Sequence, residues 1–245
     1  MRFLFSPPAP DVRGLLHLPW GRPLEAWDPG LLVNVPERGI SRHVVRFVAD
    51  GGHVYALKEI QRRLARREYD LLGRFRDEGL PTVSAVGIVV DRPRGQEAVL
   101  VTRYLENTVP FRWLFSSHGR THPADQLLDA LVELLVRLHR AGVFWGDCSL
   151  SNTLFRDDAG ALTAYLVDAE TSEQHAALSR GQRAHDVDLA RERVGAEMLD
   201  LRFGGLLPED LDPIETSDSL PRRYEARWEA ITRSPGRWDR LPGRI

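Results

Sequence analysis

The chain has 245 residues, of which 42% are hydrophobic and 28% are charged, and its formal net charge is −2. This composition predicts a globular protein of one domain or two small lobes, and the charge argues against a nucleic-acid-binding protein. The single cysteine, Cys148, excludes an intramolecular disulfide and a cysteine-cluster zinc site. No apolar run approaches the roughly 20 residues that span a bilayer, and early prolines interrupt any secretory leader, so we expect a cytoplasmic protein without a transmembrane segment.

The first half of the chain favours β-structure around one helix. Residues 1–30 hold six of the 16 prolines and predict an extended N-terminal segment with at most a short helix. Helical spacing of apolar residues predicts a helix over residues 61–79. Runs of β-branched and aromatic residues between turn residues predict five antiparallel strands, at residues 31–36, 43–49, 53–60, 82–90 and 97–105.

The second half is helical with one small hairpin. Leucines at helical spacing predict a helix over 125–140, and similar patterns predict helices over 182–201 and 222–233. Two short apolar runs at 153–155 and 162–168 flank a turn and predict the hairpin. The predicted fold class is therefore α+β, with an N-terminal extension (1–30), a β-rich lobe (31–105) and a mostly helical lobe (106–245).

One basic residue differs from all others. Of the 33 Lys and Arg residues, only Lys58 is a lysine, near the end of the third predicted strand. A coding bias toward arginine accounts for the other 32, but lysine offers a compact ammonium that arginine cannot replace. A carboxylate on the following helix would hold this ammonium. Glu68 fits that role better than Glu59, because Glu59 neighbours Lys58 on a strand and points to the opposite face.

The segment WGDCSLSN (145–152) carries the other candidate chemistry. It places Asp147 five residues before Asn152 in a loop, and Asp168 follows the hairpin. Asp and Asn are common in turns, which gives these residues a purely structural alternative. Two carboxylates and a carboxamide at one loop-built edge are also the oxygen ligands that Mg²⁺ prefers. Phosphoryl transfer requires such a metal, a cation on the phosphates and a carboxylate that orients the attacking hydroxyl.

The ordered set of these residues resembles the protein-kinase-like superfamily, over roughly residues 31–205. YALK ends at Lys58 like the strand-three lysine motif, and Glu68 matches its helix partner. Asp147 and Asn152 match the D-x-x-x-x-N catalytic loop, and Asp168 matches the metal-binding Asp of D-F-G. More narrowly, the motifs GISRHVVRF, YALKEI, FWGDCSLSNTLF and LVDAET resemble an uncharacterised bacterial family that is distantly similar to lipopolysaccharide kinases.

The resemblance implies a two-lobed kinase-like fold and an ATP- and Mg²⁺-dependent kinase, a transferase with a hydroxyl acceptor. Asp147, Lys58 and Glu68 would be the catalytic residues, and Asn152 and Asp168 would hold the metal. Nucleotide phosphates would contact Lys58 and the main chain of Gly39, Ile40 and Ser41.

The chain also departs from the superfamily pattern. Trp145 replaces the catalytic-loop His and is expected to pack as a hydrophobic prop, and Ser149 replaces the lysine of Ser/Thr protein kinases. D-F-G reads Asp168-Ala169-Glu170, the phosphate turn has one glycine, and no A-P-E motif lies at a natural distance. These absences favour a small-molecule, sugar or lipid-linked glycan acceptor over a protein. They also leave open a catalytically silent nucleotide-binding pseudokinase or scaffold.

Several other residues have two interpretations each. Glu170 is a second metal ligand or, more simply, a solvated or Arg-paired carboxylate. Asp186 caps a helix or supports the catalytic loop from below. His139 is expected to be a packed structural histidine, and Cys148 has no setting for redox chemistry. Arg62, Arg63, Arg66 and Arg67 suggest RNA or lipid binding, but a solvated helix face paired with carboxylates explains them better.

Overall fold

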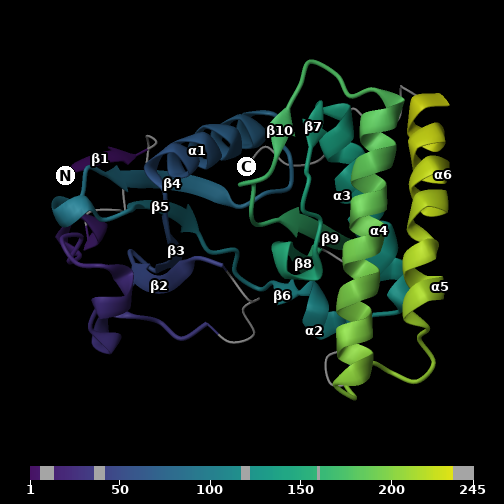
Figure 1. The fold of residues 1–245 in the computed structure, drawn as a ribbon, viewed down its shortest axis with the longest axis horizontal. Coiled ribbons are helices and arrows are strands. Elements are labelled where there is room, and N and C mark those ends of the chain that lie inside the picture. The colour runs from purple at the N-terminus through teal and green to yellow at the C-terminus, as the bar shows by residue number, and fades with distance from the viewer. Residues whose placement is uncertain (6–13, 36–41, 117–121, 159–160, 234–245) are drawn as a thin grey trace. The chain divides into compact units, whose positions relative to one another are not determined.

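The computed structural model describes residues 1–5, 14–35, 42–116, 122–158 and 161–233 (Figure 1). The chain folds as two compact units. Unit 1 comprises residues 1–110, 151–156 and 165–172, and unit 2 comprises residues 111–150, 157–164 and 173–245. The base of the hairpin and the residues that follow it therefore belong to unit 1, with the N-terminal half of the chain.

Unit 1 is built on a five-stranded antiparallel sheet in the order β1-β4-β5-β3-β2. The strands are β1 (Arg2–Phe5), β2 (Val44–Asp50), β3 (His53–Ile60), β4 (Ser84–Val90) and β5 (Ala98–Arg103). Helix α1 (Arg62–Asp77) packs against β4 and β5. The described part of the unit also contains the 3₁₀ helices η1 (Gly14–His17), η2 (Leu24–Ala26), η3 (Pro29–Leu31) and η4 (Pro93–Gly95).

The five-stranded antiparallel sheet was predicted, but one of its strands was assigned wrongly. Of the predicted strand at 31–36, the described residues 31–35 do not form a strand, because Asp28 Oδ1 accepts a hydrogen bond from Gly30 N (2.8 Å) and caps the 3₁₀ helix η3. After it, Val33 N donates to Phe47 O (2.8 Å), but residues 32–35 form no ladder with β2. The fifth strand is instead β1, which pairs with β4 at the sheet edge.

Side chains of residues 14–30 contribute to the core of unit 1. Trp20 and Trp27 pack edge to face with ring centroids 5.3 Å apart, and Trp20 Nε1 donates to Leu15 O (2.7 Å). These side chains cover the sheet face formed by alternate strand residues such as Leu57 and Val101. The opposite face carries Lys58, since side chains alternate along β3.

A three-stranded sheet in the order β6-β8-β9 contains the predicted hairpin. Its strands are β6 (Val109–Pro110), β8 (Thr153–Asp158) and β9 (Ala161–Leu166), and η5 (Leu150–Asn152) precedes β8. Within unit 1, Val83 N donates to Leu166 O (3.1 Å) and Leu166 N donates to Pro81 O (3.0 Å). These bonds fix the end of β9 beside the start of β4, just before Asp168.

Unit 2 is mainly helical. Its elements are α2 (Phe111–Phe115), α3 (Ala124–Arg140), β7 (Val143–Phe144), β10 (Glu173–Gln174), α4 (Arg180–Phe203), α5 (Pro213–Asp218) and α6 (Leu220–Arg233). Helix α3 buries its leucine face, and α6 packs against both α3 and α4. Within the described parts of the chain, no helix combines the length and apolar character that crossing a bilayer requires.

The turn after α3 depends on a glycine. Gly142 has a φ of +74°, and a Cβ there would lie 2.1 Å from His175 O. His175 N donates to Gly142 O (2.8 Å), next to the pairing of β7 with β10. The close approach of these two backbone segments therefore excludes a side chain, and it sets where the segment with Asp147 leaves α3.

We predict that Trp20→Ala lowers the free energy of unfolding by about 3–5 kcal/mol, because it removes a large side chain that is 1% exposed from the core of unit 1. Urea denaturation followed by circular dichroism measures the change. Leu16→Ala, at a side chain that is 47% exposed, is the control and should cost much less. A loss below about 1 kcal/mol for Trp20→Ala would mean that the N-terminal segment contributes little to the core.

Candidate active site

The alternation of β3 selects which carboxylates meet Lys58. Lys58 of β3 lies opposite Leu100 of β5, and its side chain is on the sheet face toward α1. Glu59 points to the other face, where its Oε2 accepts from Leu24 N (3.2 Å) and its Oε1 accepts from the buried Arg92. The predicted choice of Glu68 over Glu59 as the partner of Lys58 is therefore consistent with the contacts in unit 1.

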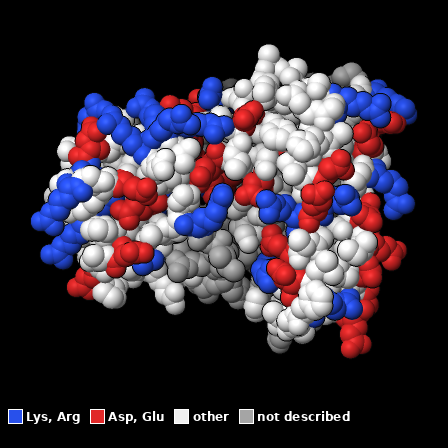
Figure 2. Space-filling model, in the orientation of Figure 1, with Lys and Arg blue, Asp and Glu red and all other residues white. Residues whose placement is uncertain are grey.

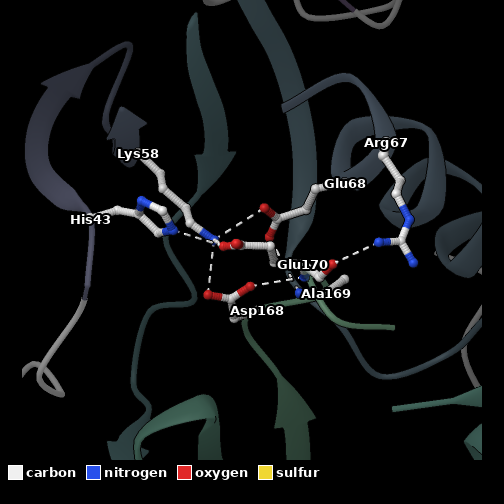
Figure 3. Close-up of polar contacts among 7 residues, drawn as sticks. All are labelled: His43, Lys58, Arg67, Glu68, Asp168, Ala169 and Glu170. Atoms are coloured by element: carbon white, nitrogen blue, oxygen red, sulfur yellow. Dashed lines mark hydrogen bonds and ion pairs between the residues drawn. The ribbon is translucent and has the colours of Figure 1, made fainter. Parts of the chain in front are cut away.

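Three carboxylates surround the Lys58 ammonium (Figure 3). Its Nζ lies 3.1 Å from Glu68 Oε2, 2.8 Å from Asp168 Oδ2 and 3.0 Å from Glu170 Oε2. Residues from β3, from α1 and from the segment after β9 thus meet at one point within unit 1. The ammonium has three N–H groups and faces three carboxylate acceptors.

The segment 168–172 is held along its backbone as well. Ala169 N donates to Glu68 Oε1 (3.2 Å), and Glu170 N donates to Asp168 Oδ1 (2.9 Å). Arg67, on α1, donates to the backbone oxygens of Glu170 (3.1 Å) and Ser172 (2.7 Å). Consecutive residues of α1 therefore hold the segment by its backbone, and Lys58 holds it by its side chains.

Asn152 lies in the same unit, at the start of the hairpin. Its backbone oxygen accepts from Val167 N (3.1 Å), which brings it next to the residue before Asp168. The predicted metal ligands Asn152 and Asp168 are thus joined through adjacent backbone. The role of either residue toward a metal stays a prediction.

The charges of this cluster influence one another. Burial lowers the pKa of Lys58, but the carboxylates of Glu68 and Asp168 raise it by more than burial lowers it. The net shift of the pKa is therefore upward. Burial and the charge of Asp168 raise the pKa of Glu68 to about 7, against the opposing effect of Lys58. Burial alone would raise the pKa of Asp168, but Lys58 outweighs burial and lowers it. The ammonium is therefore protonated, and Asp168 is the more strongly ionised of these two carboxylates.

The environment of Glu170 differs from the simpler of its two predicted environments. The residue was expected to be solvated or paired with an arginine, but its side chain is only 14% exposed and contacts Lys58. The same Oε2 lies 2.9 Å from Nε2 of His43, just before β2. The sequence did not reveal this contact, because His43 is 127 positions away along the chain.

The carboxylates of Glu68, Asp168 and Glu170 each place an oxygen within 4.8 Å of the others. Oxygen atoms at this spacing suit a hard divalent cation such as Mg²⁺. The same carboxylates surround the Lys58 ammonium, and of the two predicted metal ligands only Asp168 belongs to this cluster, so the metal site stays a prediction.

The loop that carries Asp147 is anchored inside unit 2. The buried Asp186 of α4 accepts hydrogen bonds from Trp145 N (2.6 Å) and Gly146 N (2.8 Å). Gly146 has a φ of +78°, which favours glycine at this turn. Asp186 was expected either to cap a helix or to hold the loop from below. The structure favours the second role, since the Asp186 carboxylate binds the backbone of the two residues directly before Asp147.

A further pair holds Asp186 in place. His139 Nε2 lies 3.0 Å from Asp186 Oδ2, and His139 Nδ1 lies 2.7 Å from the Tyr224 hydroxyl. His139 is packed and structural, as predicted, and Trp145 is buried as a hydrophobic prop. The Asp147 carboxylate lies 3.7 Å from Arg193 Nε, a contact that the sequence did not reveal.

Four further residues that the sequence analysis named are the phosphate-turn residues Gly39, Ile40 and Ser41, and Cys148. Gly39, Ile40 and Ser41 lie outside the described residues. Cys148 is buried, and burial raises the pKa of its thiol well above the usual value, in keeping with the absence of a predicted redox role.

The arginines of α1 form a mixed surface rather than a basic one. Arg62 pairs with Asp91 (2.5 Å), Arg66 with Asp70 (3.2 Å) and Arg76 with Asp77 (3.0 Å). Figure 2 shows red carboxylates interspersed among the blue side chains over this part of unit 1. Arg67 turns instead to the segment 168–172. Of the predicted cluster, Arg62 and Arg66 therefore fit the solvated, carboxylate-paired interpretation.

We predict that Glu68→Gln changes how stability depends on pH. Because the folded pKa of Glu68 lies near 7, above its ordinary 4.5, wild-type stability falls as pH rises through this window. The stability of wild type relative to Glu68→Gln should fall by up to about 3 kcal/mol between pH 5 and pH 8. The contribution of Asp168, whose pKa is lowered, changes only below this range.

Urea denaturation at pH 5, 6, 7 and 8 measures this difference. Glu25→Gln, at an exposed carboxylate of unit 1, is the control and should run parallel to wild type. Parallel curves for Glu68→Gln and wild type would contradict the raised pKa.

Comparisons with known proteins agree with this architecture. The sequence model of the lipopolysaccharide kinase (Kdo/WaaP) family matches residues 52–197, which is more than half of the chain. This range contains Lys58, Glu68, Asp147, Asn152 and Asp168. No curated protein sequence matches the chain.

Among solved structures, one similar to this chain is that of WaaP in complex with acyl carrier protein. It has a TM-score of 0.59 and 22% sequence identity, over 96% of this chain and 94% of that chain. At this identity the likeness shows the fold alone. Because the family model matches more than half of the chain, the protein belongs to the lipopolysaccharide kinase (Kdo/WaaP) family, a family of kinases.

Proposed function

We propose that the protein is an ATP- and Mg²⁺-dependent phosphotransferase that acts on a hydroxyl of a small molecule, a sugar or a lipid-linked glycan. The observation that carries the proposal is the position of Lys58 between Glu68 and Asp168, 3.1 and 2.8 Å from its Nζ. A lysine held by a helix carboxylate beside a metal-binding Asp is the arrangement that positions nucleotide phosphates in kinases. Membership of a lipopolysaccharide kinase family supports the same reaction class.

Lys58 would bind the nucleotide phosphates as a point charge. Its ammonium is protonated, because the neighbouring carboxylates raise its pKa more than burial lowers it. Glu68 would keep the side chain in position and would not contact the nucleotide itself, since it is 2% exposed and its other oxygen accepts from Ala169 N.

Asn152 and Asp168 would hold Mg²⁺. The lowered pKa of Asp168 supports this role, because an ionised carboxylate binds a hard cation best. When bound, the ion would offset the negative charge of the phosphates.

Asp147 would orient the acceptor hydroxyl and accept its proton. Its support from Asp186 is rigid, since both backbone N–H groups before Asp147 donate to one buried carboxylate. A rigid loop fits a residue that must hold a hydroxyl in one direction. Ser149 stands where Ser/Thr protein kinases have a lysine, and no A-P-E motif lies at a natural distance. A sugar hydroxyl therefore suits this chain better than a protein side chain.

The proposal is tested in two steps. Calorimetric titration with ATP, with and without Mg²⁺, measures binding, and transfer of radiolabelled phosphate to a panel of sugars and core oligosaccharides measures activity. Binding with labelled product supports the kinase. Binding without hydrolysis or any labelled product would favour a silent nucleotide-binding module, the alternative that the sparse phosphate turn leaves open.

We predict that Asp147→Asn separates catalysis from binding. Because the variant keeps size and hydrogen bonding but removes the proton acceptor, turnover should fall by roughly 10²-fold or more. Affinity for ATP with Mg²⁺ should stay within about threefold. Asp200→Asn, at an exposed carboxylate of unit 2, is the control. Full turnover in the Asp147→Asn variant would remove Asp147 from the mechanism.

We predict that Asp168→Asn makes ATP binding nearly indifferent to Mg²⁺, because it removes a charged oxygen ligand. Calorimetry at several Mg²⁺ concentrations measures the dependence, with the exposed Asp70→Asn in unit 1 as the charge-matched control. If Asp168→Asn retains the wild-type dependence, the metal is held by other residues.

A further inference from the structure

Three carboxylates already contact the Lys58 ammonium: Glu68 and Asp168 accept hydrogen bonds from it, and Glu170 forms an ion pair with it. Its three N–H groups face oxygens of Glu68, Asp168 and Glu170 at 2.8–3.1 Å. A nucleotide phosphate can reach this ammonium only if one carboxylate moves away. The negative charge of three carboxylates around one ammonium also opposes the approach of an anion.

The three carboxylates are not equally held. Glu68 is buried, and its second oxygen accepts from Ala169 N. Asp168 accepts from Glu170 N through its second oxygen. By contrast, the Glu170 carboxylate contacts both Lys58 and His43 through the single oxygen Oε2. The contact of Glu170 with Lys58 is an ion pair, whereas Glu68 and Asp168 each accept a hydrogen bond from Lys58, so Glu170 is the carboxylate held least firmly at the ammonium.

His43 stabilises Glu170 in this position. Its Nε2 lies 2.9 Å from Glu170 Oε2, and Figure 3 shows the imidazole and the Lys58 ammonium converging on that carboxylate. The backbone of Glu170 is fixed separately, since Arg67 donates to its carbonyl oxygen (3.1 Å). The side chain can therefore turn away from Lys58 while the backbone next to Asp168 stays in place.

We propose that Glu170 is an internal competitor for the nucleotide: its carboxylate occupies the place on Lys58 that a nucleotide phosphate takes, and His43 stabilises this closed arrangement. This inference rests on the proposed nucleotide-binding function. Glu170 and His43 are positioning residues, because they control the availability of Lys58. Nucleotide binding then requires Glu170 to leave, and the apparent affinity is reduced by the fraction of molecules in which Lys58 is occupied.

The test compares Glu170→Gln and Glu170→Asp with wild type. If Glu170 occupies Lys58 in about nine molecules of ten, removing the contact tightens ATP binding about tenfold. Glu170→Gln removes the charge, whereas Glu170→Asp keeps the charge but shortens the side chain by one methylene, which withdraws its oxygens from Lys58. Both variants should therefore bind ATP more tightly than wild type, in calorimetric titrations with EDTA and with Mg²⁺.

Glu173→Gln is the matched control. It removes one negative charge close in sequence, but its carboxylate contacts His175 (3.4 Å) rather than Lys58. Its affinity for ATP should equal that of wild type. Tighter binding by Glu173→Gln to the same extent would show that net charge, and not the contact with Lys58, sets the affinity.

A spectroscopic readout follows Lys58 directly. Because the chain contains a single lysine, protein labelled with ¹³C at lysine Cε gives one side-chain resonance in an NMR spectrum. Without nucleotide, this resonance should shift in Glu170→Gln and Glu170→Asp relative to wild type and Glu173→Gln. Circular dichroism melting curves establish that each variant is folded. If one Glu170 variant does not fold, the other Glu170 variant alone is compared with wild type.

The outcomes separate this inference from the proposed function. Wild-type affinity in both Glu170 variants overturns the inference and leaves the kinase proposal intact. Weaker binding of ATP with Mg²⁺, together with unchanged binding in EDTA, overturns it by making Glu170 a metal ligand. Tighter binding in both variants without any phosphorylated product supports the inference while the phosphotransferase proposal fails. Absence of ATP binding in every folded variant overturns both.

Discussion

The ion pairs of the Lys58 ammonium organise unit 1. This one group joins β3, α1 and the segment 168–172, whose residues lie 10 and 110 positions away along the chain. A partly buried ammonium is costly unless carboxylates surround it, and each carboxylate here is in turn costly without the ammonium. The elements that supply these groups are therefore coupled, because moving any one of them leaves a buried charge without its partner.

The coupling has a consequence for conformational control. In this chain Ala169 and Glu170 occupy the places of Phe and Gly in D-F-G, so no aromatic side chain is present to switch between two packed positions. Backbone bonds to Glu68 and Arg67 hold the segment against α1 instead. What remains free to change is a side chain, which makes electrostatic competition at Lys58 the available form of control.

In unit 2 a buried carboxylate holds a loop in place. The Asp147 loop contains a glycine with positive φ and leaves two adjacent backbone N–H groups pointing inward. A buried carboxylate, Asp186, accepts both, and His139 with Tyr224 completes its hydrogen bonds. Buried polar groups that are fully paired in this way specify one geometry, because any other arrangement leaves a donor or acceptor unsatisfied.

The sequence by itself determined the helices α1 and α3, the hairpin, the antiparallel sheet and the choice of Glu68 over Glu59. Each of these follows from a local period, 3.6 residues in a helix or two in a strand, that holds whatever the rest of the chain does. Only the tertiary structure decided that β1 supplies the fifth strand, that Glu170 reaches Lys58 and His43, and that Asp186 supports the Asp147 loop. These contacts join residues that are between 40 and 127 positions apart, or a sheet edge to a chain end. No local period encodes them, because they depend on which of several chemically equivalent groups the packing brings within hydrogen-bond distance.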